Sequence, residues 1–91
     1  MLLATQHAFA ESNQNCAPRD RVVTRLATSY GETRQSIGIA PNNTVVEVFA
    51  SAETGTWTII VTMPTGVTCL VASGQAFETL VEAPPAPGQD A

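Results

Sequence analysis

Two cysteines, Cys16 and Cys69, are the residues of this 91-residue sequence best suited to chemistry. They form an even pair, far apart in a short chain, which favours a disulfide in an exported protein. A metal pair and a reactive thiol are the alternatives. A zinc site needs four ligands, or three and a water, and the single histidine, His7, lies in the leader. The sequence therefore predicts a disulfide and no metal, and closing a loop of roughly fifty residues would contribute about 4 kcal/mol.

Other catalytic groups are scarce. The sequence has no lysine, and its cations are Arg19, Arg21, Arg25 and Arg34. Without the leader it has no histidine either, so the commonest general base and the Schiff-base amine are missing. Eight acids remain, at Glu11, Asp20, Glu32, Glu47, Glu53, Glu78, Glu82 and Asp90. None belongs to a spaced motif, so we expect no enzyme and no cofactor; a hydrolase built from carboxylates alone is the least favoured alternative.

The charge balance narrows the class of partner. A net charge of −4 leaves no basic patch for nucleic acid or an anionic membrane surface. No stretch is apolar for long enough to cross a bilayer. We therefore expect a protein partner, with no nucleic acid and no membrane insertion.

The first ten residues resemble the end of a signal peptide. Residues 1–10 are uncharged and mostly apolar, and Ala8-Phe9-Ala10 fits the small-x-small cleavage pattern. A basic n-region is missing and the apolar run is short, so a flexible leader is the alternative and the native start stays open. We expect a periplasmic or secreted bacterial protein. Its predicted parts are a signal-peptide remnant (1–10), a flexible lead-in (11–15), one domain (16–82) and a disordered Pro-rich tail (83–91).

The domain is predicted to be α+β and to begin with a helix. Pro18 and Asp20 suit a first helical turn, the apolar residues up to Tyr30 share one side, and Gly31 is a typical stop. The helix is therefore expected from Pro18 to Tyr30. Glu32 and Arg34 follow it, and they could form a polar binding edge or, more commonly, a surface ion pair.

Four strands are expected after the helix. They are Arg34–Ala40, Thr44–Ser51, Thr56–Met63 and Val67–Ser73. Their short connections require antiparallel neighbours, so the simplest topology is a four-stranded meander with the amphipathic helix across one face. Residues 75–82 could form a short helix or a packed extended segment.

The turns predict which residues share a face. A two-residue Asn42-Asn43 loop places Ile39 beside Val46, and a three-residue loop ending at Gly66 pairs Val61 with Cys69. One face is then almost wholly apolar and is expected to lie beneath the helix, with Cys16 above Cys69. Its members are Ile37, Ile39, Val46, Val48, Trp57, Ile59, Val61, Met63, Val67, Cys69 and Val71.

The opposite face is the predicted interaction surface. Val45, Phe49, Ile60 and Leu70 would form an apolar cluster ringed by threonines, and an exposed apolar patch usually marks a contact. The occupant would be a protein partner or a second copy. The alternative is that the segment from Phe77 to Val81 folds back over the cluster.

Several runs of the sequence resemble a known family. They are Cys16–Val23 with Leu26, Tyr30–Glu32, Gly55–Ile59, Val61–Pro64 and Cys69–Ala72. Together they are similar to small, uncharacterised, exported bacterial proteins over Cys16 to about Phe77, and the cysteine pair with the Trp57 strand between is the most specific feature. The resemblance implies export and supplies no activity. We expect a non-enzymatic binding or accessory module; an inhibitor presenting the loop Ala52–Gly55 is the alternative.

Overall fold

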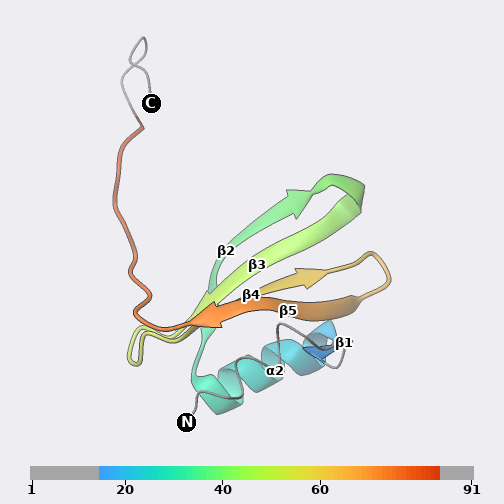
Figure 1. The fold of residues 1–91 in the computed structure, drawn as a ribbon, viewed down its shortest axis with the longest axis horizontal. Helices are drawn as coiled ribbons and strands as arrows, with labels where there is room; N and C mark the ends of the chain where they lie inside the picture. The colour runs from blue at the N-terminus through green and yellow to red at the C-terminus, as the bar shows by residue number, and fades with distance from the viewer. Residues whose placement is uncertain (1–14, 85–91) are drawn as a thin grey trace.

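The computed structural model describes residues 15–84, and these form one helix packed on a five-stranded antiparallel sheet (Figure 1). The elements are β1 (Cys16–Pro18), α2 (Arg19–Tyr30), β2 (Thr33–Ala40), the 3-10 turn η2 (Pro41–Asn43), β3 (Thr44–Ala50), β4 (Trp57–Thr62) and β5 (Val67–Gly74). The strand order is β1-β5-β4-β3-β2. The α+β class is confirmed and β2 to β5 form the expected meander, but the predicted number of strands is wrong because β1 adds a fifth.

Helix α2 ends at Tyr30 as the sequence predicts, and it begins one residue later than expected, at Arg19. Pro18 precedes it in an extended conformation (φ −57°, ψ 144°), so the missing proline N–H costs the first turn nothing. Gly31 ends it in the left-handed region (φ 65°), and its N–H donates to the carbonyl of Ala27 at 3.1 Å. Between these ends the helix buries Val22 and Leu26 against the sheet.

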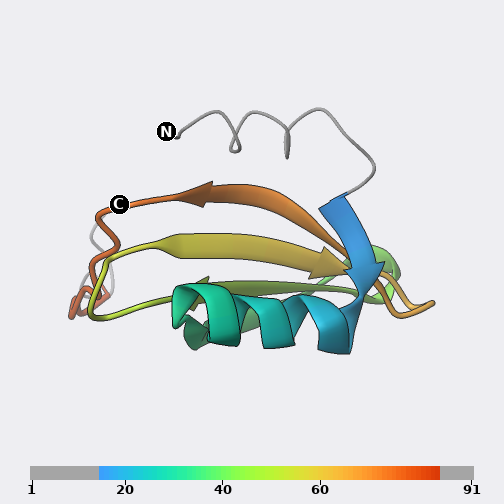
Figure 2. The same ribbon diagram turned by 90° about the horizontal axis from the view of Figure 1, so that it is seen from below.

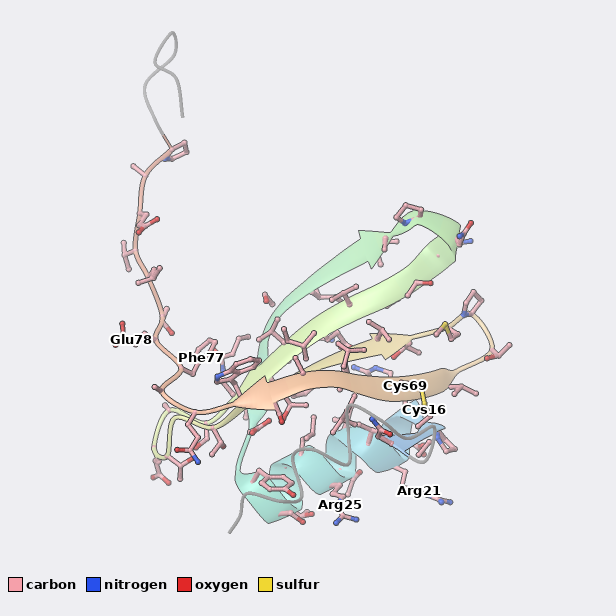
Figure 3. All side chains as sticks on the ribbon, in the orientation of Figure 1. Cys16, Arg21, Arg25, Cys69, Phe77 and Glu78 are labelled. Carbon is pink, nitrogen blue, oxygen red and sulfur yellow. A yellow bond between two sulfur atoms is a disulfide. The ribbon has the colours of Figure 1, made fainter. Side chains whose placement is uncertain are left out.

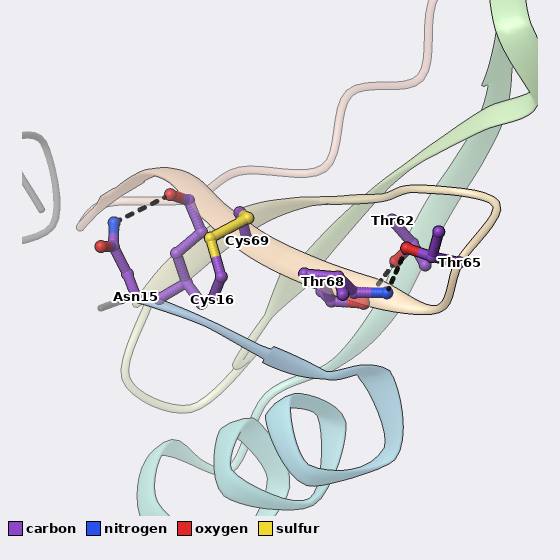
Figure 4. The surroundings of a disulfide bond; sticks show 8 residues. Asn15, Cys16, Thr62, Thr65, Thr68 and Cys69 are labelled. Carbon is purple, nitrogen blue, oxygen red and sulfur yellow. Dashed lines mark hydrogen bonds between the residues drawn. A yellow bond between two sulfur atoms is a disulfide. The ribbon is translucent and has the colours of Figure 1, made fainter. Parts of the chain in front are cut away.

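Strand β1 explains how the two cysteines meet. Cys16 pairs with Cys69 across β1 and β5, with their Cα atoms 4.0 Å apart, and their sulfurs form the predicted disulfide. The bond therefore joins neighbouring strands of one sheet (Figure 4), and the expectation that it joins the helix layer to the sheet is wrong. A three-residue strand that ends in proline is too short to leave a periodic signal in the sequence.

The predicted register is correct in the middle of the sheet and wrong at its β2 edge. Val48 pairs with Ile59 and Val61 with Cys69, as expected. The loop between β2 and β3 has three residues instead of two, because Asn42 and Asn43 are both left-handed (φ 67° and 61°). Ile39 consequently faces Val45 and not Val46.

The two faces of the sheet have the opposite roles to those predicted. Phe49 and Ile60, with 3% and 0% of their surface exposed, form the core with Val22 and Leu26 of α2, and Leu70 packs against them. The predicted interaction face of Val45, Phe49, Ile60 and Leu70 is thus on the helix side. The threonines on this face do not indicate a solvent-exposed surface. Thr62 and Thr68 are buried, and their hydroxyl oxygens are joined by a hydrogen bond of 2.7 Å.

The direction of β1 accounts for this exchange of faces. Strand β1 lies within the sheet and continues directly into α2 (Figure 2). Side chains alternate along a strand, so Cys16 and Ala17 point to opposite faces. Ala17 packs against the helix core, which leaves the disulfide on the other side.

The segment after β5 is extended and packs beside the turn before β4. The N–H of Phe77 donates to the carbonyl of Gly55 at 2.9 Å, and the Trp57 indole donates to the carbonyl of Gln75 at 3.1 Å. Leu80 and Val81 are exposed, so this segment does not cover the cluster around Phe49. The predicted signal remnant, most of the lead-in and most of the tail lie outside the described residues.

Candidate functional site

The face of the sheet opposite α2 is the main candidate for contact with another molecule. We call it the open face, and it consists of Val46, Val48, Trp57, Ile59, Val61, Met63, Val67 and Cys69. These residues occupy aligned positions on β3, β4 and β5, except Met63, which directly follows β4. Met63 and Val67, at the edge of the open face, are 40% and 43% exposed. The others are partly buried by their neighbours within the sheet. No helix or strand of residues 15–84 covers them.

The open face has no charged member. The described acids and arginines lie on α2, near the start of β2, on the helix side of β3, in the turn between β3 and β4 or in the segment after β5. A contiguous apolar surface without charge suits an apolar surface of another protein and offers no group for catalysis.

Trp57 is fixed at one end of the open face. Its ring lies against Gly74, where an added Cβ would come within 2.8 Å of the indole Cζ2 atom. The indole N–H, on the edge of the ring nearest to Gly74, donates a hydrogen bond to the carbonyl of Gln75. Glycine is therefore required beside the ring, and the indole presents a rigid surface.

The disulfide lies on the open-face side of the β1–β5 pair. Cys69 is aligned with Val61, and Cys16 with Cys69, so the row continues to the last strand of the sheet. Next to it, the Asn15 side-chain amide donates to the carbonyl of Leu70 at 3.2 Å (Figure 4). The covalent bond and this hydrogen bond together hold β1 on β5.

A buried carboxylate lies on the helix side of the sheet. Glu47 of β3 is fully buried, and its Oε1 accepts a hydrogen bond from Arg19 Nε at 3.0 Å. Its Oε2 accepts from Arg19 Nη2 and, at 3.1 Å, from Arg34 Nη1. The hydrogen bonds from Arg19, and secondarily from Arg34, lower the pKa of Glu47 below its usual value of 4.5, and the same contact raises the pKa of Arg19. Both arginines are occupied in holding the fold together.

Sequence reasoning missed this cluster and misassigned its neighbours. The available signal was a lone acid between Val46 and Val48 in an apolar strand, which requires a cationic partner when buried. Glu32 and Arg34 do not form the expected ion pair, since Arg34 reaches Glu47. Glu32 is 2% exposed where α2 joins β2, and its Oε1 has no hydrogen-bond partner among residues 15–84.

The described chain offers neither a metal site nor a membrane-spanning helix. Between residues 15 and 84, no three histidine, cysteine, aspartate or glutamate side chains gather where they could hold a metal ion. The described part also contains no helix of the length and hydropathy needed to span a membrane. The open face remains the best-defined candidate.

Comparison with known proteins identified no relative of this chain. No family model matches the chain, and no curated protein and no solved structure matches it. The resemblance to small exported bacterial proteins therefore stays an expectation from the residues that carry it.

Proposed function

We propose that this protein is a small, exported, non-enzymatic binding module that docks a protein partner through the open face. The observation that carries the proposal is a charge-free apolar sheet face with no covering layer in the described chain. Large apolar patches exposed to water are rare in folded proteins and usually mark a contact with another molecule.

The size of the open face suits a reversible contact. Three to four strands spaced about 4.8 Å apart and about 20 Å long present roughly 300–400 Å² in projection. This is the scale of transient complexes, which bury less than about 1,200 Å² in total over both partners. The partner surface should be flat and apolar, because the open face has neither a charge nor a deep pocket to select a polar ligand.

The disulfide supports the exported part of the proposal. Bonds of this kind persist in the periplasm and outside the cell, where the thiol pool is oxidising. We expect the mature protein in the periplasm or the medium, with residues 1–10 removed. Cell fractionation followed by intact-mass measurement checks this, and a reduced, full-length chain recovered from the cytoplasm would contradict it.

Site-specific photo-crosslinking tests the contact surface. A benzophenone amino acid replaces Met63 on the open face or, as a control, Ile39, which is 68% exposed on the opposite side of the sheet. In the producing cell we expect an adduct of discrete mass from position 63 and none from position 39. Adding the near-isosteric changes Val48→Thr and Val61→Thr should abolish the adduct, because they remove apolar surface while preserving strand propensity.

The outcomes separate a specific partner from nonspecific adhesion. Equal adducts from both positions, or an adduct that survives the two threonine changes, would exclude the open face as the contact. The folded state of each variant is verified by the fluorescence of Trp57, the single tryptophan in the sequence.

A further inference from the structure

The two edges of the sheet differ in how they are closed. At the β5 edge, β1 adds three residues and ends in Pro18, which has no N–H to offer a further strand. Beyond β1, a bulge at Val71 interrupts β5. Short edge strands, proline and bulges all prevent a sheet from pairing further. In Figure 3 the Cys16–Cys69 disulfide marks this closed edge, and β2 forms the opposite edge.

Strand β2 has none of these features over its last five residues. Ser36–Ala40 pairs with β3 in unbroken register and contains neither a charged residue nor a proline. Because β2 is the last strand of the sheet, the outer backbone groups of this stretch have no partner strand among residues 15–84. Such groups on a regular edge are a template for an added strand. We call Ser36–Ala40 the β2 edge.

Two isoleucines make the β2 edge apolar. Ile37 pairs with Glu47, a residue of the helix side. Ile39, two residues later, points to the same side of the sheet. The two side chains are 55% and 68% exposed, so α2 covers neither of them. Gly38 lies between them on the other side, and no atom lies within 4 Å of a Cβ added there.

The β2 edge is symmetric about Gly38. Its sequence, Ser-Ile-Gly-Ile-Ala, has an isoleucine on each side of the glycine and a small residue at each end. If a second copy lies antiparallel with Gly38 opposite Gly38, Ile37 of each copy faces Ile39 of the other. Residues directly opposite lie on one face of the sheet, with Cβ atoms about 4.5–5.5 Å apart. Four isoleucines then form one cluster, and the opposite face has no side chain at the axis.

We propose that the β2 edge binds the β2 edge of a second copy, in an antiparallel dimer with twofold symmetry. A second copy fits because the symmetry of the edge covers both isoleucines of both chains in a single contact. A twofold contact uses the same surface on each copy and therefore closes on itself. Five residues give a seam of about 17 Å, which places the dimer among small, reversible interfaces of less than about 1,200 Å².

The charge of the chain does not oppose this contact. The net charge is −4, but β2 contains no acid. Glu47, on the strand behind the edge, is bound by Arg19 and Arg34. The two copies therefore meet without a concentration of negative charge at the seam.

The dimer has a consequence for the open face. Paired strands keep their faces in common, so the two open faces lie on one side of a joined sheet. Together they present roughly 600–800 Å², close to the area of about 800 Å² that each partner contributes to a standard interface. This consequence rests on the proposed function, whereas the pairing of the β2 edges does not.

Sedimentation velocity of the full-length, disulfide-bonded protein tests the dimer. Between about 5 and about 500 µM we expect the mass to rise from one chain to two, with a Kd of about 10–100 µM. Ile39→Lys should weaken the association at least about tenfold, because a lysine on an edge opposes pairing. Val71→Lys is the matched control. Val71 is 54% exposed on β5, so the same charge is added near the other edge and the Kd should not change.

A single mass at all concentrations, or equal effects of the two lysine changes, would overturn the proposal. The double change Val48→Thr and Val61→Thr on the open face should leave the dimer intact. If it abolished the dimer, the copies would meet through the open face and the β2 edge would be excluded. Loss of a partner adduct from position 63, with the dimer retained, would contradict the proposed function alone.

An exchange of charges tests the register. Ile37→Glu and Ile39→Lys should each be monomeric alone, and an equimolar mixture should form a dimer. In the proposed register the new lysine lies directly opposite the new glutamate, and opposite charges at such positions attract. A mixture of Ile39→Lys with Ile39→Glu places the charges diagonally and should recover less. A mixture that stays monomeric, or equal recovery in both mixtures, would overturn the antiparallel pairing about Gly38.

The crosslinking control at position 39 lies in this seam. Its benzophenone replaces one of the two isoleucines, which changes the edge that the second copy would meet. A crosslink between two copies has twice the mass of the chain, so it is distinguished from an adduct with a different protein.

Discussion

Arg19, the first residue of α2, holds the carboxylate of Glu47 through two hydrogen bonds, although Glu47 lies fully buried in β3. The contact fixes the start of the helix over the third strand, and Arg34 adds a bond from the edge strand β2. Three elements that are separate in sequence therefore share one ion cluster. A buried charge of this kind is expensive to leave without its partners.

Replacing Glu47 by glutamine should destabilise the fold by about 2 kcal/mol, because the two guanidinium groups lose their counter-charge while the amide keeps one acceptor oxygen. Urea unfolding followed by tryptophan fluorescence measures the change. Glu53→Gln, in the exposed turn before β4, is the matched control and should stay within about 0.5 kcal/mol of the unchanged protein. Equal values for the two variants would show that the cluster adds nothing to stability.

Acid should weaken the fold through the same residue. The pKa of Glu47 is lower in the folded protein than its usual value of 4.5, so the unfolded chain binds the proton more readily. The stabilisation is therefore complete above about pH 5 and is lost as the pH falls through the folded pKa. We expect the stability difference between the unchanged protein and Glu47→Gln to shrink as the pH is lowered from about 5 to about 3. A difference that stays constant over this range would contradict the assignment.

Reduction of the disulfide should cost about 4 kcal/mol, the chain-entropy value for a loop of this length. The closed loop is long, with the two cysteines separated by 53 residues. The measurement compares denaturation of the oxidised protein with that of a Cys16→Ser, Cys69→Ser double variant. A reducing agent should shift the midpoint of the unchanged protein and leave the double variant as it was. Identical midpoints for the oxidised protein and the double variant would mean that hydrogen bonding alone holds β1 in place.

Two glycines should respond oppositely to alanine. At Gly74 a new Cβ would meet the Trp57 ring, so Gly74→Ala should destabilise the protein by about 1–3 kcal/mol and change the tryptophan emission. At Gly38 nothing lies within 4 Å of the added atom, so Gly38→Ala should be neutral or stabilising by about 0.5 kcal/mol. Thermal unfolding of both variants checks the contrast. A normal melting temperature for Gly74→Ala would show that the ring moves freely.

Substitutions on the two faces of the sheet test which face the helix covers. Phe49→Ala should cost about 3–4 kcal/mol, because it leaves a cavity beneath α2. Val61→Thr, on the open face, should cost about 1 kcal/mol or less, since its new hydroxyl can reach water. Chemical denaturation ranks the two. The reverse order would indicate that the helix covers the open face instead.

Local signals were enough to predict most of the elements. The helix end at Gly31, the meander and the pairing of Val48 with Ile59 all follow from turn residues and alternation along the chain. The disulfide followed from the scarcity of other ligands. Each of these inferences needed only residues close together in the sequence or, for the disulfide, the absence of further metal ligands.

The choice of face could not be predicted in this way. Both faces of the sheet carry large apolar side chains, so hydropathy alone does not decide which one α2 covers. The deciding feature is β1, which fixes where the helix begins and on which side Ala17 points. The threonines wrongly suggested a solvent-exposed face. The hydroxyls of Thr62 and Thr68 are hydrogen-bonded to each other and can therefore be buried.

The Cys16–Cys69 bond also determines how the protein carries mechanical load. Residues 17–68, which contain α2 and three of the strands, lie inside the covalent ring. A stretching force applied to the chain on either side of this ring passes from Cys16 directly to Cys69. The helix and the β2–β4 hairpins are then outside the line of tension, and only the part of β5 after Cys69 can be peeled away. In the oxidised state residues 17–68 therefore add no length to a chain under tension.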